Sequence, residues 1–308
     1  MFSLLVAITM YLAVAPTRPV LTVNDLRPKA DPPHLSLAAP IVRPAAPYKK
    51  DPARLGAATS AHSAVVVDWE SGARLLEKNA DEPASIASIT KLMTALVVLS
   101  TKTDWNKEVE IQGSDDRPGG IPYVAPGELV TVGDLFNLSL VASANNATVA
   151  LVRSTGLTPE EFSRRMNQKA SAIGMKNARF VDPTGLDPGN TASAADVAQL
   201  VKYALAESAI RAAVNRETYR FTARTGREHA VRSTDQLLGS FLSKPPYAFL
   251  GGKTGYLEEA GYCLGAAAEN GDGRRVIAVA LGADTIDQRF RDVKGLIFWA
   301  FDAFAWPK

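Results

Sequence analysis

The order of local patterns along the chain limits its fold more than any other feature. A strand–turn–strand pattern comes first, in residues 62–79. Helical patterns dominate residues 100–207, and strand patterns return at 247–256, 260–269 and 274–284. Because strands stand at both ends and helices between them, one sheet has to be assembled from both ends of the chain. We expect an α/β fold of the α+β type: an antiparallel sheet flanked by helices, with an inserted, mainly helical lobe.

Composition narrows the function classes. The chain has 308 residues, of which 46% are hydrophobic, and this is enough for a large core. Its net charge is +2. Basic residues are scattered, without a stripe interleaved with aromatics, so a nucleic-acid partner is not expected. The three histidines lack the spacing of metal ligands, and we expect neither a metal nor a cofactor. The single cysteine, Cys263, excludes an intrachain disulfide.

The N-terminal 54 residues differ from the rest. Residues 1–15 form an apolar run ending in Ala13-Val14-Ala15, which predicts a signal peptide or an uncleaved anchor. Residues 16–54 are rich in proline and predict an extended linker. The remaining 55–308 would be the globular domain, with its helical lobe at about 100–207. We expect export to the periplasm or the wall face of the membrane, with membrane contact only through an uncleaved N-terminal segment.

A lysine stands out in the apolar helical stretch 87–98. Lys91 lies three residues after Ser88, so on a helix the two side chains share one face. A serine hydroxyl becomes a nucleophile when a base takes its proton. An amine can be that base when burial or a second cation lowers its pKa. The alternative is a lysine that extends past an apolar face to reach solvent.

Two further triplets are candidates for the same site. Ser143-Ala144-Asn145 interrupts a buried helical stretch with polar side chains, which need partners there. The alternative is a helix break that uses Ser and Asn as caps. Lys253-Thr254-Gly255 ends a strand pattern and could hold a substrate carboxylate. Its glycine would let another backbone approach closely.

Together and in this order, the Ser88–Lys91 pair and the two triplets match the S-x-x-K, S-D-N and K-T-G set of penicillin-binding proteins and class A β-lactamases. Ala144 replaces the aspartate of the second motif. The sequence resembles the low-molecular-mass penicillin-binding proteins, the serine D-alanyl-D-alanine carboxypeptidases, over about residues 58–305. The resemblance includes the segments ASITKLMTA, GELVTVGDLFNLSLVASANNATVAL, SAADVAQL and GGKTGYLEEAGYCLGAAA.

The resemblance implies a role for each site residue. Ser88 would be the acylated nucleophile, Lys91 its general base and Ser143 a proton relay. Asn145 would contact substrate and base, Lys253 and Thr254 would bind the terminal carboxylate of D-alanine, and Gly255 would belong to the same substrate-binding segment. The backbone N–H groups of Ser88 and Tyr256 would form the oxyanion hole. Substrate would be a peptidoglycan stem peptide, and β-lactams would be inhibitors.

Two departures from the family pattern leave the exact activity open. Ser233-Thr234-Asp235 stands where the family often has Asn-Thr-Asn. The last pattern in the sequence is a helix ending near Trp306, so we expect neither the second β-rich domain nor the amphipathic anchor of many carboxypeptidases. Shorter members resemble D,D-endopeptidases, which cut peptide crosslinks. A β-lactamase and a non-catalytic wall-binding protein are further alternatives, although no glutamate stands in the loop pattern that class A β-lactamases use.

Overall fold

The computed structural model describes residues 44–118 and 121–307. The predicted signal peptide or anchor at 1–15 and residues 16–43 of the predicted linker lie outside the described residues. Within the described part, no helix combines the length and apolarity needed to cross a bilayer. The described residues belong to one compact unit, Arg43–Lys308.

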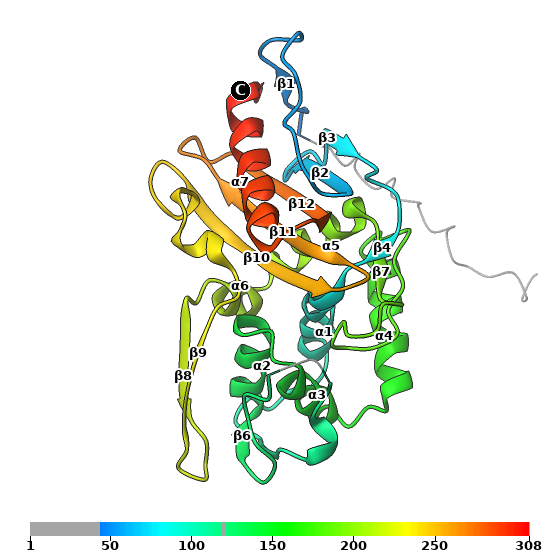
Figure 1. Cartoon of the computed structure of the whole chain (residues 1–308), viewed down its shortest axis with the longest axis vertical. Helices are drawn as coiled ribbons and strands as arrows, with labels where there is room; N and C mark the ends of the chain where they lie inside the picture. Colours follow the sequence, from blue (N-terminus) through cyan, green and yellow to red (C-terminus); the bar gives the residue numbers. More distant parts are fainter. Residues whose placement is uncertain (1–43, 119–120, 308) are drawn as a thin grey trace, which may run out of the picture. The chain divides into compact units, whose positions relative to one another are not determined.

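A five-stranded antiparallel sheet forms the centre, in the order β10-β11-β12-β2-β3 (Figure 1). Its strands are β2 (Ser63–Asp68), β3 (Arg74–Lys78), β10 (Ala248–Leu257), β11 (Gly261–Glu269) and β12 (Arg275–Ala283). N-terminal and C-terminal strands meet where β12 pairs with β2. The α+β fold with a sheet built from both ends is thereby confirmed.

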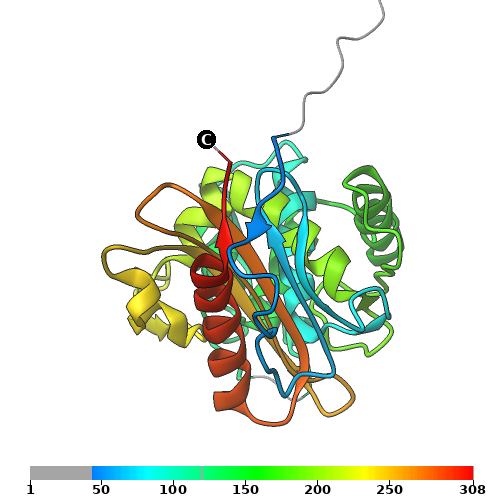
Figure 2. The ribbon, with the colours of Figure 1, turned by 90° about the horizontal axis from the view of Figure 1, so that it is seen from above.

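Both faces of the sheet are covered. Successive residues of a strand point to opposite faces, and Val65 and Val67 of β2 belong to one core cluster while Ala64 and Val66 belong to another. Helix α7 (Ile286–Ala303) packs on β11 and β12 at one face, and α5 (Ala194–Ala206) packs on β12 and β2 at the other (Figures 1 and 2). This double cover explains why β2 is buried at every position.

Helix α1 (Thr90–Leu99) is the centre of the helical region. Every residue from Thr90 to Val98 is buried, because α1 contacts helices on several sides. Its neighbours, besides α5, are α2 (Val132–Val141), α3 (Asn145–Ser154) and α4 (Pro159–Ala172). A short helix α6 (Ser208–Val214) follows α5 and packs on α2. Although α5 falls in the range predicted for the lobe, it covers the sheet.

Short strand pairs and 3-10 helices complete the fold. The pairs are β4 (Ala84–Ser85) with β7 (Thr191–Ala192), β5 (Glu108–Glu110) with β6 (Leu129–Thr131), and β8 (Thr218–Thr222) with β9 (Glu228–Arg232). The 3-10 helices are η2 (Ala87–Ile89), η3 (Gly113–Asp115), η4 (Gln236–Gly239) and η5 (Phe241–Ser243).

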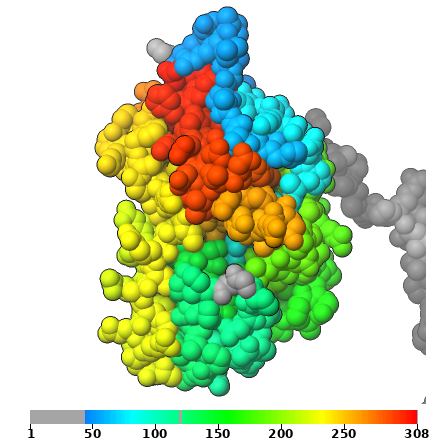
Figure 3. Space-filling view, viewed as in Figure 1, coloured from blue at the N-terminus to red at the C-terminus, as the bar shows by residue number. Residues whose placement is uncertain are grey.

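The β8–β9 hairpin is an element that we did not predict. It runs beside the helices of the lobe (yellow beside green in Figure 3) and contacts α2. Buried Glu128 anchors it, accepting one hydrogen bond from Arg227 and pairing with His229 at 2.6 Å. Alternate residues of β8 and β9 are charged or polar, so the strands bury only a narrow face and carry little hydrophobic signal.

The last part of the predicted linker is not extended away from the domain. Strand β1 (Tyr48–Lys49) pairs with β13 (Phe304–Ala305). The Lys50 backbone N–H also donates to the Ala303 carbonyl oxygen at 2.9 Å. Pro47 and Pro52 flank this short strand and leave its backbone donors free to pair. The packed region therefore begins before residue 55.

Candidate active site

Ser88 stands at the entry to the central helix, in η2. The preceding residue, Ala87, has a φ of 46°, in the left-handed region that alanine rarely adopts. Ala87 and Ile89 are buried, whereas the Ser88 side chain is half-buried and lines an open cavity of about 930 Å³. The Ser88 hydroxyl thus lies at the cavity wall, between two buried apolar residues.

Lys91 is fully buried, one turn after Ser88. Its Nζ donates to Ser88 Oγ at 2.8 Å, to Asn145 Oδ1 at 2.7 Å and to the Thr184 carbonyl oxygen at 2.6 Å. Burial lowers the pKa of Lys91 well below its ordinary value, the nearby charge of Lys253 lowers it further, and Asp182 opposes the shift. An amine with these surroundings can accept a proton from the hydroxyl beside it. The alternative of a lysine reaching solvent is therefore wrong.

The second triplet lies at the turn between α2 and α3. Ser143 has a φ of 57° there, and α3 begins at Asn145. The triplet is thus a helix break, and the break turns two polar side chains toward the other motifs. Ser143 Oγ accepts from Lys253 Nζ at 2.8 Å, while Asn145 holds Lys91. These contacts supply the partners that buried polar groups need.

The third triplet lies on the edge strand β10. Lys253 is 1% exposed, and its Nζ donates to Ser143 Oγ and to the Thr254 carbonyl oxygen. Burial lowers the pKa of Lys253 to about 7, the charge of Arg289 lowers it further, and Asp235 raises it. Thr254 lines the cavity and shares a hydrogen bond of 2.7 Å with Thr234.

Two glycines allow backbone segments to meet around Ser88. A Cβ on Gly255 would lie 2.6 Å from the Ile86 carbonyl oxygen, so only glycine lets β10 approach the backbone before Ser88 this closely. A Cβ on Gly185 would lie 2.0 Å from the Ala87 carbonyl oxygen, and Gly185 also has a φ of 82°. Tyr256, the residue after Gly255, is 52% exposed and stacks on Tyr262 with ring centroids 4.4 Å apart.

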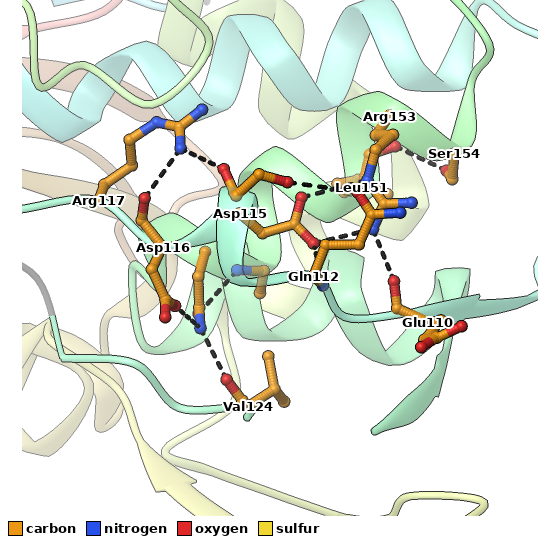
Figure 4. A network of polar contacts seen from close by, with 12 residues as sticks. Glu110, Gln112, Asp115, Asp116, Arg117, Val124, Leu151, Arg153 and Ser154 are labelled. Carbon is orange, nitrogen blue, oxygen red and sulfur yellow. Dashed lines mark hydrogen bonds and ion pairs between the residues drawn. The ribbon is translucent and has the colours of Figure 1, made fainter. Parts of the chain in front are cut away.

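A polar network holds residues 113–118 and 121–124 (Figure 4). Arg117 and Tyr123 of these segments line the cavity. The guanidinium of Arg153 donates to both carboxylate oxygens of Asp115 and to the Glu110 carbonyl oxygen. Asn146, next to Asn145, donates to Asp116 and to the Val124 carbonyl oxygen. Because α3 supplies both anchors, the same helix positions Asn145 and this wall.

The structure brings together all eight predicted site residues and adds others. Ser88, Ser143, Asn145, Thr254, Gly255 and Tyr256 line one cavity, with Lys91 and Lys253 buried at its wall. Thr184 supplies a third acceptor for Lys91 from a loop whose sequence is equally typical of a plain turn. Arg289, whose Nη1 donates to the Gly255 carbonyl oxygen at 3.0 Å, had no sequence signal beyond a helical pattern. Among the described residues, no three His, Cys, Asp or Glu side chains gather as metal ligands would.

A serine at the entry to a helix and a buried lysine in the first turn of that helix, facing a polar helix break and an edge strand, define the class of penicillin-binding serine peptidases. Residues 49–285 match the model of the D-alanyl-D-alanine carboxypeptidase family, and the chain belongs to this family.

Similar proteins carry more than one activity in their names. The chain is 34% identical over 257 residues to the D-alanyl-D-alanine carboxypeptidase DacF of Bacillus subtilis, covering 80% of this chain and 64% of that protein. A D-alanyl-D-alanine endopeptidase of Pseudomonas aeruginosa is 32% identical over 236 residues, covering 75% of this chain and 74% of that protein. The match to DacF therefore spans just under two thirds of its length.

Solved structures share the fold. A DD-transpeptidase from Streptomyces superposes with a TM-score of 0.74 at 26% identity, covering 81% of this chain and all of that one. A penicillin-binding protein from Listeria monocytogenes, in its cefotaxime-bound form, gives a TM-score of 0.69 at 31% identity. That match covers 80% of this chain and 100% of the other.

Proposed function

We propose that this protein is a serine D,D-peptidase that cleaves the D-alanyl-D-alanine bond of peptidoglycan stem peptides through an acyl-enzyme on Ser88. The observation that carries the proposal is the 2.8 Å contact between Ser88 Oγ and Lys91 Nζ, with the amine fully buried. Burial and the charge of Lys253 favour the neutral form of Lys91, which is the form that a general base requires.

In the proposed reaction, Ser88 Oγ bonds to the carbonyl carbon of the penultimate D-alanine while its proton moves to Lys91. The backbone N–H groups of Ser88 and Tyr256 would stabilise the oxyanion. As the bond to the terminal D-alanine breaks, a proton passes through Ser143 to the leaving amine. Ser143 Oγ accepts a hydrogen bond from Lys253 Nζ, so the hydroxyl hydrogen of Ser143 is free to be donated. Water then hydrolyses the ester and regenerates Ser88.

Lys253 and Thr254 would bind the terminal carboxylate of the substrate, with Asn145 contacting its backbone. A protonated Lys253 at the cavity wall, with the Thr254 hydroxyl beside it, offers charge-assisted donors for such a group. β-Lactams carry a carboxylate and an acylating carbonyl, so they would acylate Ser88 in the same orientation. The β-lactam-bound relative of this fold supports that expectation.

A D,D-endopeptidase that cuts peptide crosslinks is the second candidate, and the endopeptidases among the similar proteins favour keeping it. We further propose that the protein is exported, with residues 1–15 as signal peptide or anchor, 16–43 as linker, and the peptidase domain in the remainder to residue 308. Membership of a family that acts on cell-wall peptides supports export.

Labelling with a fluorescent penicillin tests the nucleophile. We expect one covalent label per chain, and we expect Ser88→Ala to abolish it while the circular dichroism spectrum is unchanged. Ser85→Ala is the matched control, since Ser85 lies three residues earlier and its hydroxyl has no hydrogen-bond partner among the described residues. Label that persists in Ser88→Ala would contradict the proposal, and rapid loss of label from the wild type would point to a β-lactamase.

Mass spectrometry of products from a pentapeptide monomer and from a crosslinked dimer separates the two candidate activities. Loss of one alanine from the monomer is expected of a carboxypeptidase, whereas conversion of the dimer to monomers is expected of an endopeptidase. Cleavage of neither substrate by protein that still binds penicillin would contradict both activities.

A further inference from the structure

Asp235 is a buried carboxyl group at the edge of the site, and the proposed reaction does not use it. It follows β9 and caps η4, where its Oδ1 accepts from the Leu237 backbone N–H at 2.9 Å. Asp235 is 6% exposed, and its Oδ2 has no hydrogen-bond partner among the described residues. A cap needs only one oxygen, so the second oxygen calls for another explanation.

The unpartnered oxygen faces the strand that carries Lys253. A Cβ built on Gly252 would lie 2.7 Å from Asp235 Oδ2, so the carboxyl group lies against the backbone immediately before Lys253. Two cations act on it electrostatically: Lys253 from β10 and Arg289 from α7. Arg289 is itself 5% exposed, and its Nε lacks a partner among the described residues.

Two buried cations beside each other are unfavourable unless an anion compensates them. The charge of Arg289 lowers the pKa of Lys253, whereas Asp235 raises it. Asp235 also raises the pKa of Arg289, which burial lowers. Burial raises the pKa of Asp235 to about 6, against the Leu237 hydrogen bond and the two cations. At neutral pH the carboxylate is thus charged, and it favours the charged form of Lys253.

We propose that Asp235 is a positioning residue: its buried carboxylate is the counter-ion of Lys253 and Arg289, and it keeps Lys253 protonated to receive the terminal carboxylate of substrate. The inference rests on the proposed function and extends it to a residue that departs from the Asn-Thr-Asn family pattern. Asp235 acts through Lys253 and need not touch substrate.

The test is the pH profile of the second-order rate of acylation by benzylpenicillin, measured for the wild type and Asp235→Asn. The asparagine keeps an oxygen for the Leu237 N–H and removes only the charge. An opposite charge nearby shifts a pKa by about one unit or more, so we expect the alkaline limb to move to lower pH by about one unit. The rate would then fall about tenfold at pH 8 and change much less at pH 5.5, where the wild-type carboxyl group is mostly neutral.

A merely structural role would lower the rate equally at all pH values, and that result would overturn the proposal. Asp68→Asn is the matched control, because Asp68 is also a buried carboxyl group of the sheet region but bonds to Ser71 and Trp306. The alkaline limb of the acylation profile of Asp68→Asn should stay at the wild-type pH. If Asp235→Asn fails to fold, Asp235→Ser keeps a capping oxygen and should give the same shift.

A double-mutant comparison separates this inference from the proposed function. In a Lys253→Arg background, the cation is charged at all pH values of the assay, so adding Asp235→Asn should leave the profile unchanged. A shift that persists in that background would overturn the role assigned to Asp235. Wild-type protein that is not acylated at all would instead contradict the proposed function.

Discussion

Two lysines are buried in the walls of one cavity, and their surroundings differ. Lys91 on α1 donates to acceptors from three segments, and the carboxylate that acts on it electrostatically is Asp182. Lys253 on β10 donates to Ser143 Oγ and to the Thr254 carbonyl oxygen, and the charge of Asp235 raises its pKa.

Burial lowers the pKa of both lysines, and in each case a nearby cation lowers it further while an aspartate opposes the shift. The pKa of Lys91 falls well below its ordinary value, because burial and the charge of Lys253 lower it against the opposing charge of Asp182. The pKa of Lys253 falls to about 7, because Asp235 partly offsets burial and Arg289. The two lysines differ in the groups that they contact: Lys91 lies against the Ser88 hydroxyl, whereas Lys253, on the strand that borders the cavity, lies against Ser143. The fold thus assigns one residue type to two positions in the site.

Exchanging each lysine for arginine is the strongest test of this difference. Lys91→Arg replaces the base by a group that stays charged, so we expect the rate of penicillin acylation to fall by about 10³–10⁴-fold. Lys253→Arg keeps the positive charge, and at pH 6 its loss should be at most about 100-fold, from altered geometry. Stopped-flow or gel-based acylation rates measure both. Equal losses in the two variants would contradict the assignment of different roles.

Gly185 tests the wall that holds Lys91. In Gly185→Ala the new Cβ would overlap the Ala87 carbonyl oxygen, displacing the loop that provides the Thr184 acceptor. We expect a loss of about 1–3 kcal/mol in the free energy of unfolding and about 100-fold in acylation.

Gly226→Ala is the control for backbone strain alone. Gly226 also has a positive φ, 89°, but a Cβ there would meet no atom within 4 Å. Its acylation rate should match the wild type, even if urea unfolding shows a modest loss of stability. A similar loss of activity in both variants would mean that close packing at Gly185 does not position Lys91.

The pH dependence of acylation of the free enzyme should show both lysines. Lys91 has to be neutral, so the rate rises with pH through its lowered pKa and forms the acid limb. Lys253 has to be charged, so the rate falls as pH passes about 7, by about tenfold per unit. Lys253→Arg should remove the alkaline limb and keep the acid limb. An alkaline limb that survives this substitution belongs to another group.

The smallest effect is expected from Thr234. Thr234→Val removes the hydrogen bond to Thr254 and leaves the two lysines in place. Loss of one hydrogen bond of about 0.5–1.5 kcal/mol predicts a decrease of about 2–10-fold in kcat/KM, mainly through KM for a substrate with a free carboxylate. Thr222→Val, at an exposed position of the β8–β9 hairpin, is the control and should leave both constants unchanged.

Sequence alone determined the features that depend on local geometry. The strand alternation at 62–79 and 260–284 indicated the sheet, and the three-residue spacing of Ser88 and Lys91 placed both on one helical face. The three motifs, Ser88-x-x-Lys91, Ser143-Ala144-Asn145 and Lys253-Thr254-Gly255, were all recognised from their order along the chain. The β8–β9 hairpin was missed because its alternating polar residues are weakly hydrophobic.

Only the tertiary structure decided the charge states and the secondary partners. Lys91 meets Asn145 and Thr184 from 54 and 93 residues away, and Lys253 meets Ser143 across 110 residues. The place of Asp235 and Arg289 beside Lys253 likewise follows from packing between separate elements. The physical reason is that a helix or strand repeats over a few residues, whereas desolvation and Coulomb interactions depend on which distant segments fold against a group.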